Sequence, residues 1–154
     1  MYTLPHSSLS IRLPLWRSLS AALAALLLSV SALAAPMGTQ DIKNVRQVIQ
    51  AQLDAFAADD AVKAFSYAAP NVRSSVASAD HFMAMVRGHY AVVYRPASVA
   101  FMQPEREGKL VTQAVQMSDA EGVAWLAVYT LQQQKNKQWR ITGCFVHGTN
   151  GRMA

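Results

Sequence analysis

Apolar positions follow one period in the first half of the chain and another in the second half. Between residues 42 and 56 they recur at steps of three and four, which predicts a helix with one buried stripe. The stripe consists of Ile42, Val45, Ile49, Leu53 and Phe56. Thr39 is the predicted N-cap, and Asp41 in the first turn suits the positive end of the helix dipole.

Two shorter helices are expected to follow. The aspartates at 59–60 interrupt the stripe and precede a short helix over residues 62–67, and Pro70 stops that helix because the residue before a proline disfavours helical geometry. A third helix is expected to open at Ser78 and to stop at Gly88. Its predicted buried positions are Phe82, Met85 and Val86.

From residue 99 the period changes to two, which predicts strands. Extended segments are expected at 99–104, 110–117, 123–131 and 139–146, joined by short polar turns at 105–108, 119–122 and 135–137. Helices followed by strands indicate an α+β fold, with the N-terminal helices packed on one face of a four-stranded antiparallel sheet.

The two faces of this sheet differ in composition. Odd positions carry most of the bulky apolar residues and are expected to face the helices. Even positions are more polar but include Leu126, Val128, Cys144 and Val146. This outer patch is either a homodimer contact or an apolar face without a partner. Gly143 complicates the assignment, since a glycine inside a strand often marks a bulge that reverses the side chains after it.

The first 34 residues have the pattern of a secretory signal peptide. Arg12 and Arg17 precede an uncharged apolar run, which ends at the small residues Ala32-Leu33-Ala34. Cleavage is expected after Ala34, with the protein then periplasmic or secreted. The alternative is an uncleaved membrane anchor, because the uncharged stretch approaches the ~20 residues of a span. The residue directly after the cleavage position is Ala35 and not a cysteine, which excludes a lipoprotein anchor.

Removal of the leader would leave residues 35–154 as a single α+β domain, with a core over about 39–147. The remaining 12 basic and 9 acidic residues give a net charge of +3. The basic residues are scattered along the sequence, whereas a nucleic-acid footprint would be a clustered stripe, so nucleic acid is not an expected partner. The single cysteine excludes an internal disulfide and a cysteine-based zinc cluster.

Several segments of the mature chain resemble a known bacterial family. They are residues 49–56, 64–65, 69–70 and 82–86, the segment Val93-Tyr94-Arg95-Pro96 and the segment Trp139-Arg140-Ile141-Thr142-Gly143-Cys144. Together they resemble the family catalogued as domain of unknown function 4864. The resemblance implies an NTF2-like, cystatin-like cone, in which a curved sheet wraps around a long first helix. That fold group includes steroid isomerases, polyketide cyclases, dehydratases and non-catalytic binding modules, so the fold alone supplies no activity.

The sequence offers little for proton-transfer catalysis. The three long strand segments contain no Asp or Glu, whereas an isomerase-like site needs a carboxylate base in an apolar cavity. His81, His89 and His147 have no metal-ligand spacing, so neither a metal nor a cofactor is expected. Cys144 is expected to be a packing residue rather than a nucleophile.

Aromatic residues are the best candidates for a ligand site. Tyrosine and tryptophan pair an apolar ring with a polar tip, which suits the lining of a small-molecule cavity, although the commoner role of such residues is plain core packing. Arg95 beside Tyr94 could bind an anionic group, or it could pack across an aromatic ring as a structural residue. The candidate ligand-binding residues are Tyr67, Tyr90, Tyr94, Arg95, Trp125 and Tyr129.

Two functions are consistent with these patterns. The preferred hypothesis is a non-catalytic module that binds a small apolar or weakly anionic ligand, or that serves as an interaction domain. The alternative is a small isomerase, dehydratase or cyclase that uses Tyr or His inside the cone. A binder predicts a cavity with no carboxylate or histidine in reach of its lumen, and an enzyme predicts such a group there with a shifted pKa.

Overall fold

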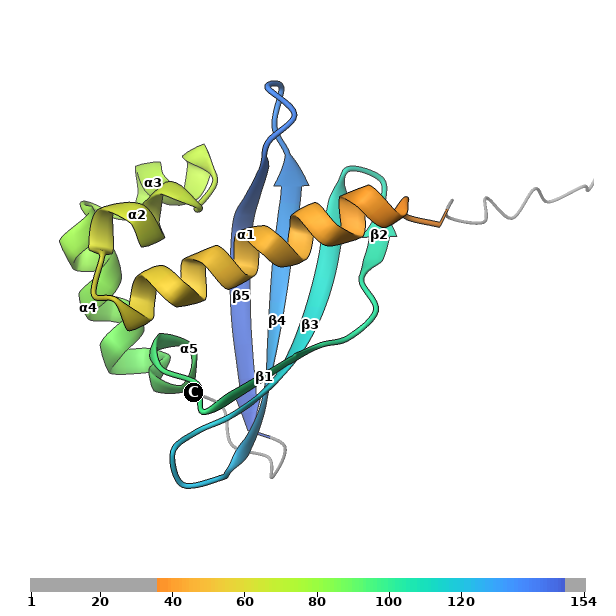
Figure 1. Ribbon diagram of the computed structural model, residues 1–154. Helices are drawn as coiled ribbons and strands as arrows, with labels where there is room; N and C mark the ends of the chain where they lie inside the picture. Colours follow the sequence, from red (N-terminus) through yellow and green to blue (C-terminus); the bar gives the residue numbers. More distant parts are fainter. Residues whose placement is uncertain (1–35, 149–154) are drawn as a thin grey trace, which may run out of the picture. The chain divides into compact units, whose positions relative to one another are not determined.

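The computed structural model describes residues 36–148, which belong to one compact unit. The predicted signal peptide over 1–34 lies outside the described residues. Five helices precede five strands (Figure 1). The helices are α1 (Thr39–Ala57), α2 (Ala61–Ser66), α3 (Pro70–Ser75), α4 (Ala79–His89) and α5 (Ala91–Tyr94). The strands are β1 (Ser98–Phe101), β2 (Glu105–Glu107), β3 (Leu110–Ser118), β4 (Ala124–Gln133) and β5 (Trp139–Gly148).

Capping side chains and a proline mark where several of the helices begin, and two of these starts differ from the sequence prediction. Asp60 and Ser78 cap α2 and α4, because their side chains accept the backbone N–H of the third helical residue. Gly38 is the N-cap of α1, so Thr39 is its first helical residue and not the cap. Pro70 not only ends the preceding segment but also begins α3, since the fixed φ of proline suits a first helical position.

The sheet is open and antiparallel, with the order β1-β3-β4-β5. The sequence predicted four strands, but residues 105–107, expected to form a turn, make the fifth strand β2. Both β1 and β2 pair with β3, at its C-terminal and N-terminal parts respectively. Hydrogen bonds hold the link between them against α1 and β3. The Met102 carbonyl accepts them from Arg46 Nη2 at 2.9 Å and from Gln113 Nε2 at 2.8 Å.

A bulge in β5 changes which residues face the helices. Thr130 pairs with Gly143, whereas Leu131 pairs with Ile141, so β5 carries one residue more than β4 at this point. Cys144 and Val146 therefore turn inward, and Phe145 turns outward with 67% of its surface exposed. The sequence placed Cys144 and Val146 on the outer face, which is wrong. The predicted homodimer contact stays a prediction, and its apolar residues become Leu126, Val128 and Phe145.

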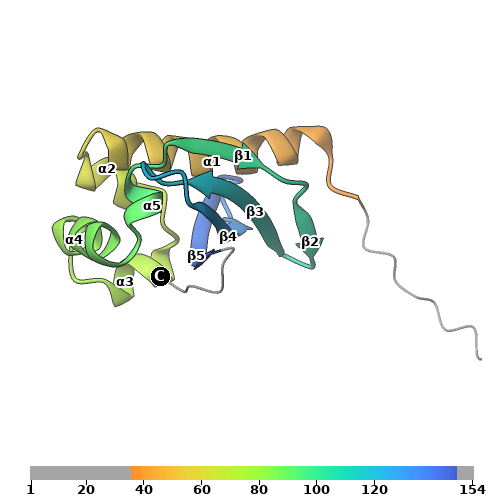
Figure 2. The same cartoon turned by 90° about the horizontal axis from the view of Figure 1, so that it is seen from below.

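Helix α1 lies across one face of the sheet, and the shorter helices lie together beyond its C-terminal half (Figures 1 and 2). Val45, Ile49 and Phe56 from the predicted stripe are almost completely buried against the inner sheet residues Val115 and Leu131. At full burial each such side chain contributes about 1.5–3 kcal/mol.

The segment between α2 and α3 joins the helical layer to the free edge of β5. Ala69 donates its backbone N–H to the Ile141 carbonyl at 2.7 Å, and Ile141 donates to the Tyr67 carbonyl at 2.9 Å. Because these bonds hold the short helices against β5, they fix one wall of the cavity described next.

Candidate functional site

A cavity of about 130 Å³ lies between the C-terminal half of α1, the short helices and strands β4 and β5. Most of its wall is apolar. The lining residues from the helical layer are Gln52, Phe56, Ala68, Val72, Phe82, Met85, Val86, Tyr90 and Val93, and those from the sheet are Tyr129, Ile141, Gly143 and Cys144. The cavity is therefore built from elements that are distant in sequence and meet only in the folded chain.

Of two polar side chains in the wall, one has a hydrogen-bond partner and the other has none among the described residues. Gln52 is buried mid-helix, and its Nε2 donates to the Ala64 carbonyl at 3.1 Å, which ties α1 to α2. The Tyr129 hydroxyl is fully buried and has no hydrogen-bond partner among the described residues. The Cys144 thiol lies beside it, close enough to contribute, after burial, to the raised pKa of the Tyr129 hydroxyl. An unpaired buried hydroxyl costs about 1–3 kcal/mol, so Tyr129 stands out as a group that a ligand could satisfy.

Burial keeps both titratable groups of the wall neutral. It raises the pKa of the Tyr129 hydroxyl well above its ordinary value of 10.0 and raises the pKa of the Cys144 thiol to about 12. At neutral pH the hydroxyl is therefore a protonated donor and the thiol is not a thiolate nucleophile.

No aspartate, glutamate or histidine lines this cavity. Asp54, the mid-helix carboxylate of α1, is exposed and accepts a hydrogen bond from Gln50 Nε2 at 2.8 Å. His81, His89 and His147 are exposed. Within residues 36–148, no three side chains of the metal-ligating types are grouped together. The wall thus offers a hydrogen-bond donor, without a carboxylate or imidazole base to move a proton.

The structure brings together two of the six candidate ligand residues. Tyr90 and Tyr129 line the cavity. Tyr67 is next to it, and its backbone carbonyl pairs with β5, but its side chain does not line the wall. Trp125 lies at the opposite end of β4, where its Nε1 donates to Asp119 Oδ2 at 2.8 Å, and this bond lowers the pKa of the Asp119 carboxyl.

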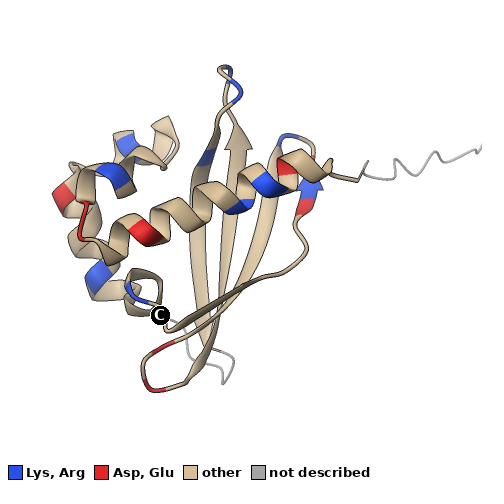
Figure 3. Ribbon diagram, in the orientation of Figure 1, with Lys and Arg blue, Asp and Glu red and all other residues tan. Residues whose placement is uncertain are grey.

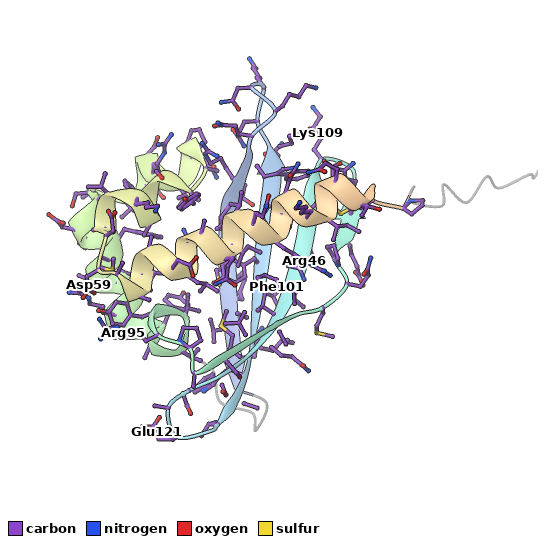
Figure 4. All side chains as sticks on the ribbon, viewed as in Figure 1. Arg46, Asp59, Arg95, Phe101, Lys109 and Glu121 are labelled. Carbon is purple, nitrogen blue, oxygen red and sulfur yellow. The ribbon has the colours of Figure 1, made fainter. Side chains whose placement is uncertain are left out.

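Tyr94 and Arg95 lie elsewhere, in a surface cluster around Asp59. The Asp59 carboxylate accepts hydrogen bonds from the Tyr94 hydroxyl, from Arg87 Nη2 at 2.6 Å and from Arg95 Nη2 at 3.1 Å. Both guanidinium groups also pack on the Tyr94 ring, with the Arg95 carbon 4.8 Å from its centroid. Asp59 and Arg95 lie on the same side of Figure 4. This geometry matches the structural alternative for Arg95, because its charge is shared with a carboxylate and a ring of the same chain.

The Asp59 cluster joins the turn after α1 to α4 and α5. The hydrogen bond from Tyr94 and then that from Arg87 lower the pKa of the Asp59 carboxyl below its ordinary value of 3.8. Since α4 and α5 supply Met85, Val86 and Val93 to the cavity, the cluster holds the helical wall in place from outside.

Most of the cavity wall was not predicted as a site. Phe82, Met85 and Val86 were expected only as core residues, because an apolar residue at helical spacing carries no sign of a nearby cavity. Gln52 did leave a signal, since it is a polar residue placed one position before Leu53 within the apolar stripe. A buried polar side chain in such a stripe points to a specific hydrogen bond or a site.

One long helix packed over an open, antiparallel sheet is the arrangement expected of an NTF2-like fold. The chain belongs to the family described as Domain of unknown function (DUF4864), which matches residues 38–154. This confirms the resemblance and the fold class inferred from the sequence. No curated protein matches the chain. Among residues 36–148, no helix has the length and apolar character needed to cross a membrane.

Two solved structures are similar to this chain. An NTF-2 like protein of unknown function from Silicibacter pomeroyi DSS-3 is 16% identical with a TM-score of 0.50, over 73% of this chain and 99% of that chain. An NTF-2 like protein of unknown function from Burkholderia xenovorans LB400 is 15% identical with a TM-score of 0.46, over 76% of this chain and 91% of that chain. The first similarity shows the fold and supplies no activity.

Proposed function

We propose that this domain binds a small, mainly apolar molecule in the cavity between α4 and strands β4 and β5, and that it does so without catalysis. The observation that carries the proposal is the buried Tyr129 hydroxyl, which lacks a hydrogen-bond partner among the described residues and lies in a mainly apolar wall. Such a cavity favours a ligand with an apolar body and one oxygen that accepts the hydrogen bond of Tyr129.

The size of the cavity limits the ligand class. An apolar cavity of roughly 150 Å³ accommodates a benzene-sized molecule. The cavity here has about 130 Å³, which suits a six-membered ring or a short branched chain. A steroid-sized substrate would require the helical wall to move.

Absence of a carboxylate or histidine from the wall favours binding over the isomerase, dehydratase or cyclase alternative. Those reactions move protons at neutral pH, and the groups present are a neutral tyrosine and a neutral thiol whose pKa values are both raised.

The test compares two probes of nearly identical shape, cyclohexanone and methylenecyclohexane, by calorimetric titration of the full chain. Only the ketone accepts a hydrogen bond from Tyr129, so the ketone is expected to bind about 5- to 15-fold more tightly, which corresponds to ~1–1.5 kcal/mol. Tyr129→Phe should abolish this preference. The matched control Tyr67→Phe, outside the wall, should keep it. Equal affinity of the two probes for the unmodified protein would contradict the proposal.

The proposed setting is the periplasm or the cell exterior. This part rests on the basic start, apolar run and Ala32-Leu33-Ala34 site of the predicted leader. Mass spectrometry of protein recovered from a bacterial host should show a chain that begins at Ala35. A chain that retains residues 1–34 in the membrane fraction would support the anchor alternative instead.

A further inference from the structure

A second hollow lies at the end of the sheet where two hairpin turns meet, and it shares no lining residue with the cavity described above. It is an open depression of about 520 Å³, lined from β2 and its turn by Arg106, Gly108 and Lys109, and from β4, β5 and their turn by Gln132, Gln133, Gln134, Lys135, Lys137 and Trp139. Lysine and arginine colour both turns in Figure 3, and Figure 4 labels Lys109.

The charge around this depression is positive and largely uncompensated. Lys109, Lys135 and Lys137 are exposed, and none of their ammonium groups forms an ion pair or a hydrogen bond with a residue in the described range. Arg106 is paired on one side, since its Nη2 lies 3.1 Å from Asp41 Oδ2. No carboxylate lines the depression, because Glu105 and Glu107 alternate with Arg106 along β2 and point to the other face.

Two buried donors beneath the lysines also lack partners. Trp139 is 3% exposed, and its Nε1 has no hydrogen-bond partner among the described residues. The same holds for Nε of Arg106, whose guanidinium carbon lies 5.4 Å from the centroid of the Trp139 ring. Buried N–H groups are nearly always paired, so this pair of orphaned donors indicates a group that the site is built to receive.

The backbone of Lys137 gives an independent indication. Its φ of +67° lies in the left-handed region, where glycine or asparagine is normal and lysine is strained. Lys137 closes a three-residue turn, with its N–H on the Gln134 carbonyl at 2.9 Å, in a position that hairpins usually give to glycine. A lysine therefore occupies this position although its backbone strain costs stability, and strain of this kind is found at functional sites.

The residue types point to a phosphoryl group. Lysine ammonium groups act as point charges that suit a phosphate, whereas carboxylate recognition relies on the two-pronged arginine fork. The fork of Arg106 is already directed at Asp41, and the lysines approach from two separate turns. A doubly charged oxyanion would match three free ammonium groups better than a single carboxylate.

We propose that the depression between the two hairpin turns is a binding site for a soluble, phosphoryl-bearing small molecule, held by Lys109, Lys135 and Lys137 above Arg106 and Trp139. The site does not depend on the apolar cavity.

The test is a titration of the full chain with inorganic pyrophosphate at low ionic strength, followed by NMR at the tryptophan indole N–H groups. The Trp139 signal should shift and saturate, and the Trp125 signal, whose N–H is held by Asp119, should stay in place. Binding should weaken as salt rises. A shift that rises linearly without saturation, or equal shifts of both indoles, would overturn the proposal.

Charge variants separate a site from general attraction. The triple variant Lys109→Gln, Lys135→Gln, Lys137→Gln should weaken pyrophosphate binding at least about tenfold, at about two- to fivefold per lysine. Net charge is tested by a matched pair, Lys135→Gln and Lys63→Gln on α2, each of which removes one charge. Lys135→Gln should weaken binding about two- to fivefold, and Lys63→Gln should leave it unchanged. An equal loss in this pair would show that net charge alone attracts the anion and would overturn the site.

Lys137→Gly distinguishes binding from folding, because its two effects have opposite signs. Glycine removes the backbone strain, so Tm should rise by about 2–6 °C. The lost ammonium should weaken pyrophosphate binding about two- to fivefold. A variant that is more stable and binds as tightly as the unmodified protein would contradict a role for Lys137.

A competition experiment with lipid vesicles tests whether the phosphoryl group belongs to a soluble molecule or to a membrane surface. Vesicles of phosphatidylglycerol present phosphoryl groups on a surface, and the proposal expects them to compete weakly with free pyrophosphate at equal phosphate concentration. A Trp139 response to vesicles but not to pyrophosphate would overturn the proposal of a soluble ligand.

Discussion

Cys144 shows at the residue scale how a one-residue bulge changes chemistry. The parity of β5 in sequence placed its thiol on the wetter face of the sheet. The inserted residue between Ile141 and Gly143 turns it inward, next to Tyr129, where burial raises its pKa. The sequence did contain the cause, Gly143, but could not show that a bulge forms there, because a strand glycine is compatible with several local geometries.

Cys144 should therefore react slowly in the folded protein. A pKa of about 12 against the ordinary 9.0 lowers the thiolate fraction at pH 8 by on the order of a thousandfold. Alkylation with iodoacetamide, followed by mass spectrometry, should be far slower in buffer than in concentrated urea. Similar rates in both would show that the thiol is accessible. Because the neutral thiol is favoured in the fold, its contribution to stability is lost as the pH rises above about 9.

Asp59 should make the fold sensitive to acid. Its folded pKa is lowered, so the stabilisation from its ionised carboxylate is present above about pH 4 and is lost as the pH falls through the lower folded value. Asp59→Asn should reduce Tm at pH 7 and flatten the fall in Tm between pH 5 and pH 3.

The substitution isolates charge from backbone, since Asp59 has a φ of +56° and asparagine tolerates this conformation as well as aspartate does. Asp54→Asn, at an exposed carboxylate that accepts a hydrogen bond from Gln50 Nε2, is the matched control and should change Tm little. Equal acid sensitivity of unmodified protein and Asp59→Asn would show that the cluster does not stabilise the fold.

At the scale of elements, regular periodicity predicted well and irregular segments did not. The long stripe from Ile42 to Phe56 predicted α1, and the capped pattern from Ser78 predicted α4. The strand β2 was mistaken for a turn because three residues are too few to show a period of two. Helices α3 and α5, with six and four residues, are also too short to show a helical period. Helices of this length are stabilised by tertiary packing and not by a local pattern.

Two glycines, one in the bulge of β5 and one in α4, allow the effect of an added Cβ on stability to be compared. A Cβ at Gly143 would lie 3.0 Å from Thr130 Oγ1, which also accepts the hydrogen bond of the Thr142 hydroxyl at 2.9 Å. Gly143→Ala should therefore destabilise the fold by about 1 kcal/mol or more.

Gly88 is the matched case, because it lies within α4 and a Cβ there meets nothing within 4 Å. Gly88→Ala should stabilise the protein by about 0.5–1 kcal/mol. Urea unfolding measures both changes. Effects of the same sign at the two positions would contradict the bulge geometry.

At the scale of the whole molecule, fold and site were predictable to different degrees. The order of helices and strands indicated the α+β class, and specific segments such as Val93-Tyr94-Arg95-Pro96 indicated the family. The cavity was not predictable in its details, because its wall combines α1, α4, β4 and β5, whose contacts arise only on folding. The basic depression was not predicted either, because its lysines are scattered in the sequence and come together only when the two hairpin turns meet in the folded chain.

The proposed function requires the apolar cavity to take up a small ligand that accepts the hydrogen bond of Tyr129. The most direct measurement is methyl NMR of the full chain titrated with cyclohexanone. Saturating shifts are expected at the cavity methyls of Met85, Val86 and Ile141, and none at the core methyls of Val45 and Val115. Shifts that are absent, or that spread evenly over cavity and core methyls, would contradict it.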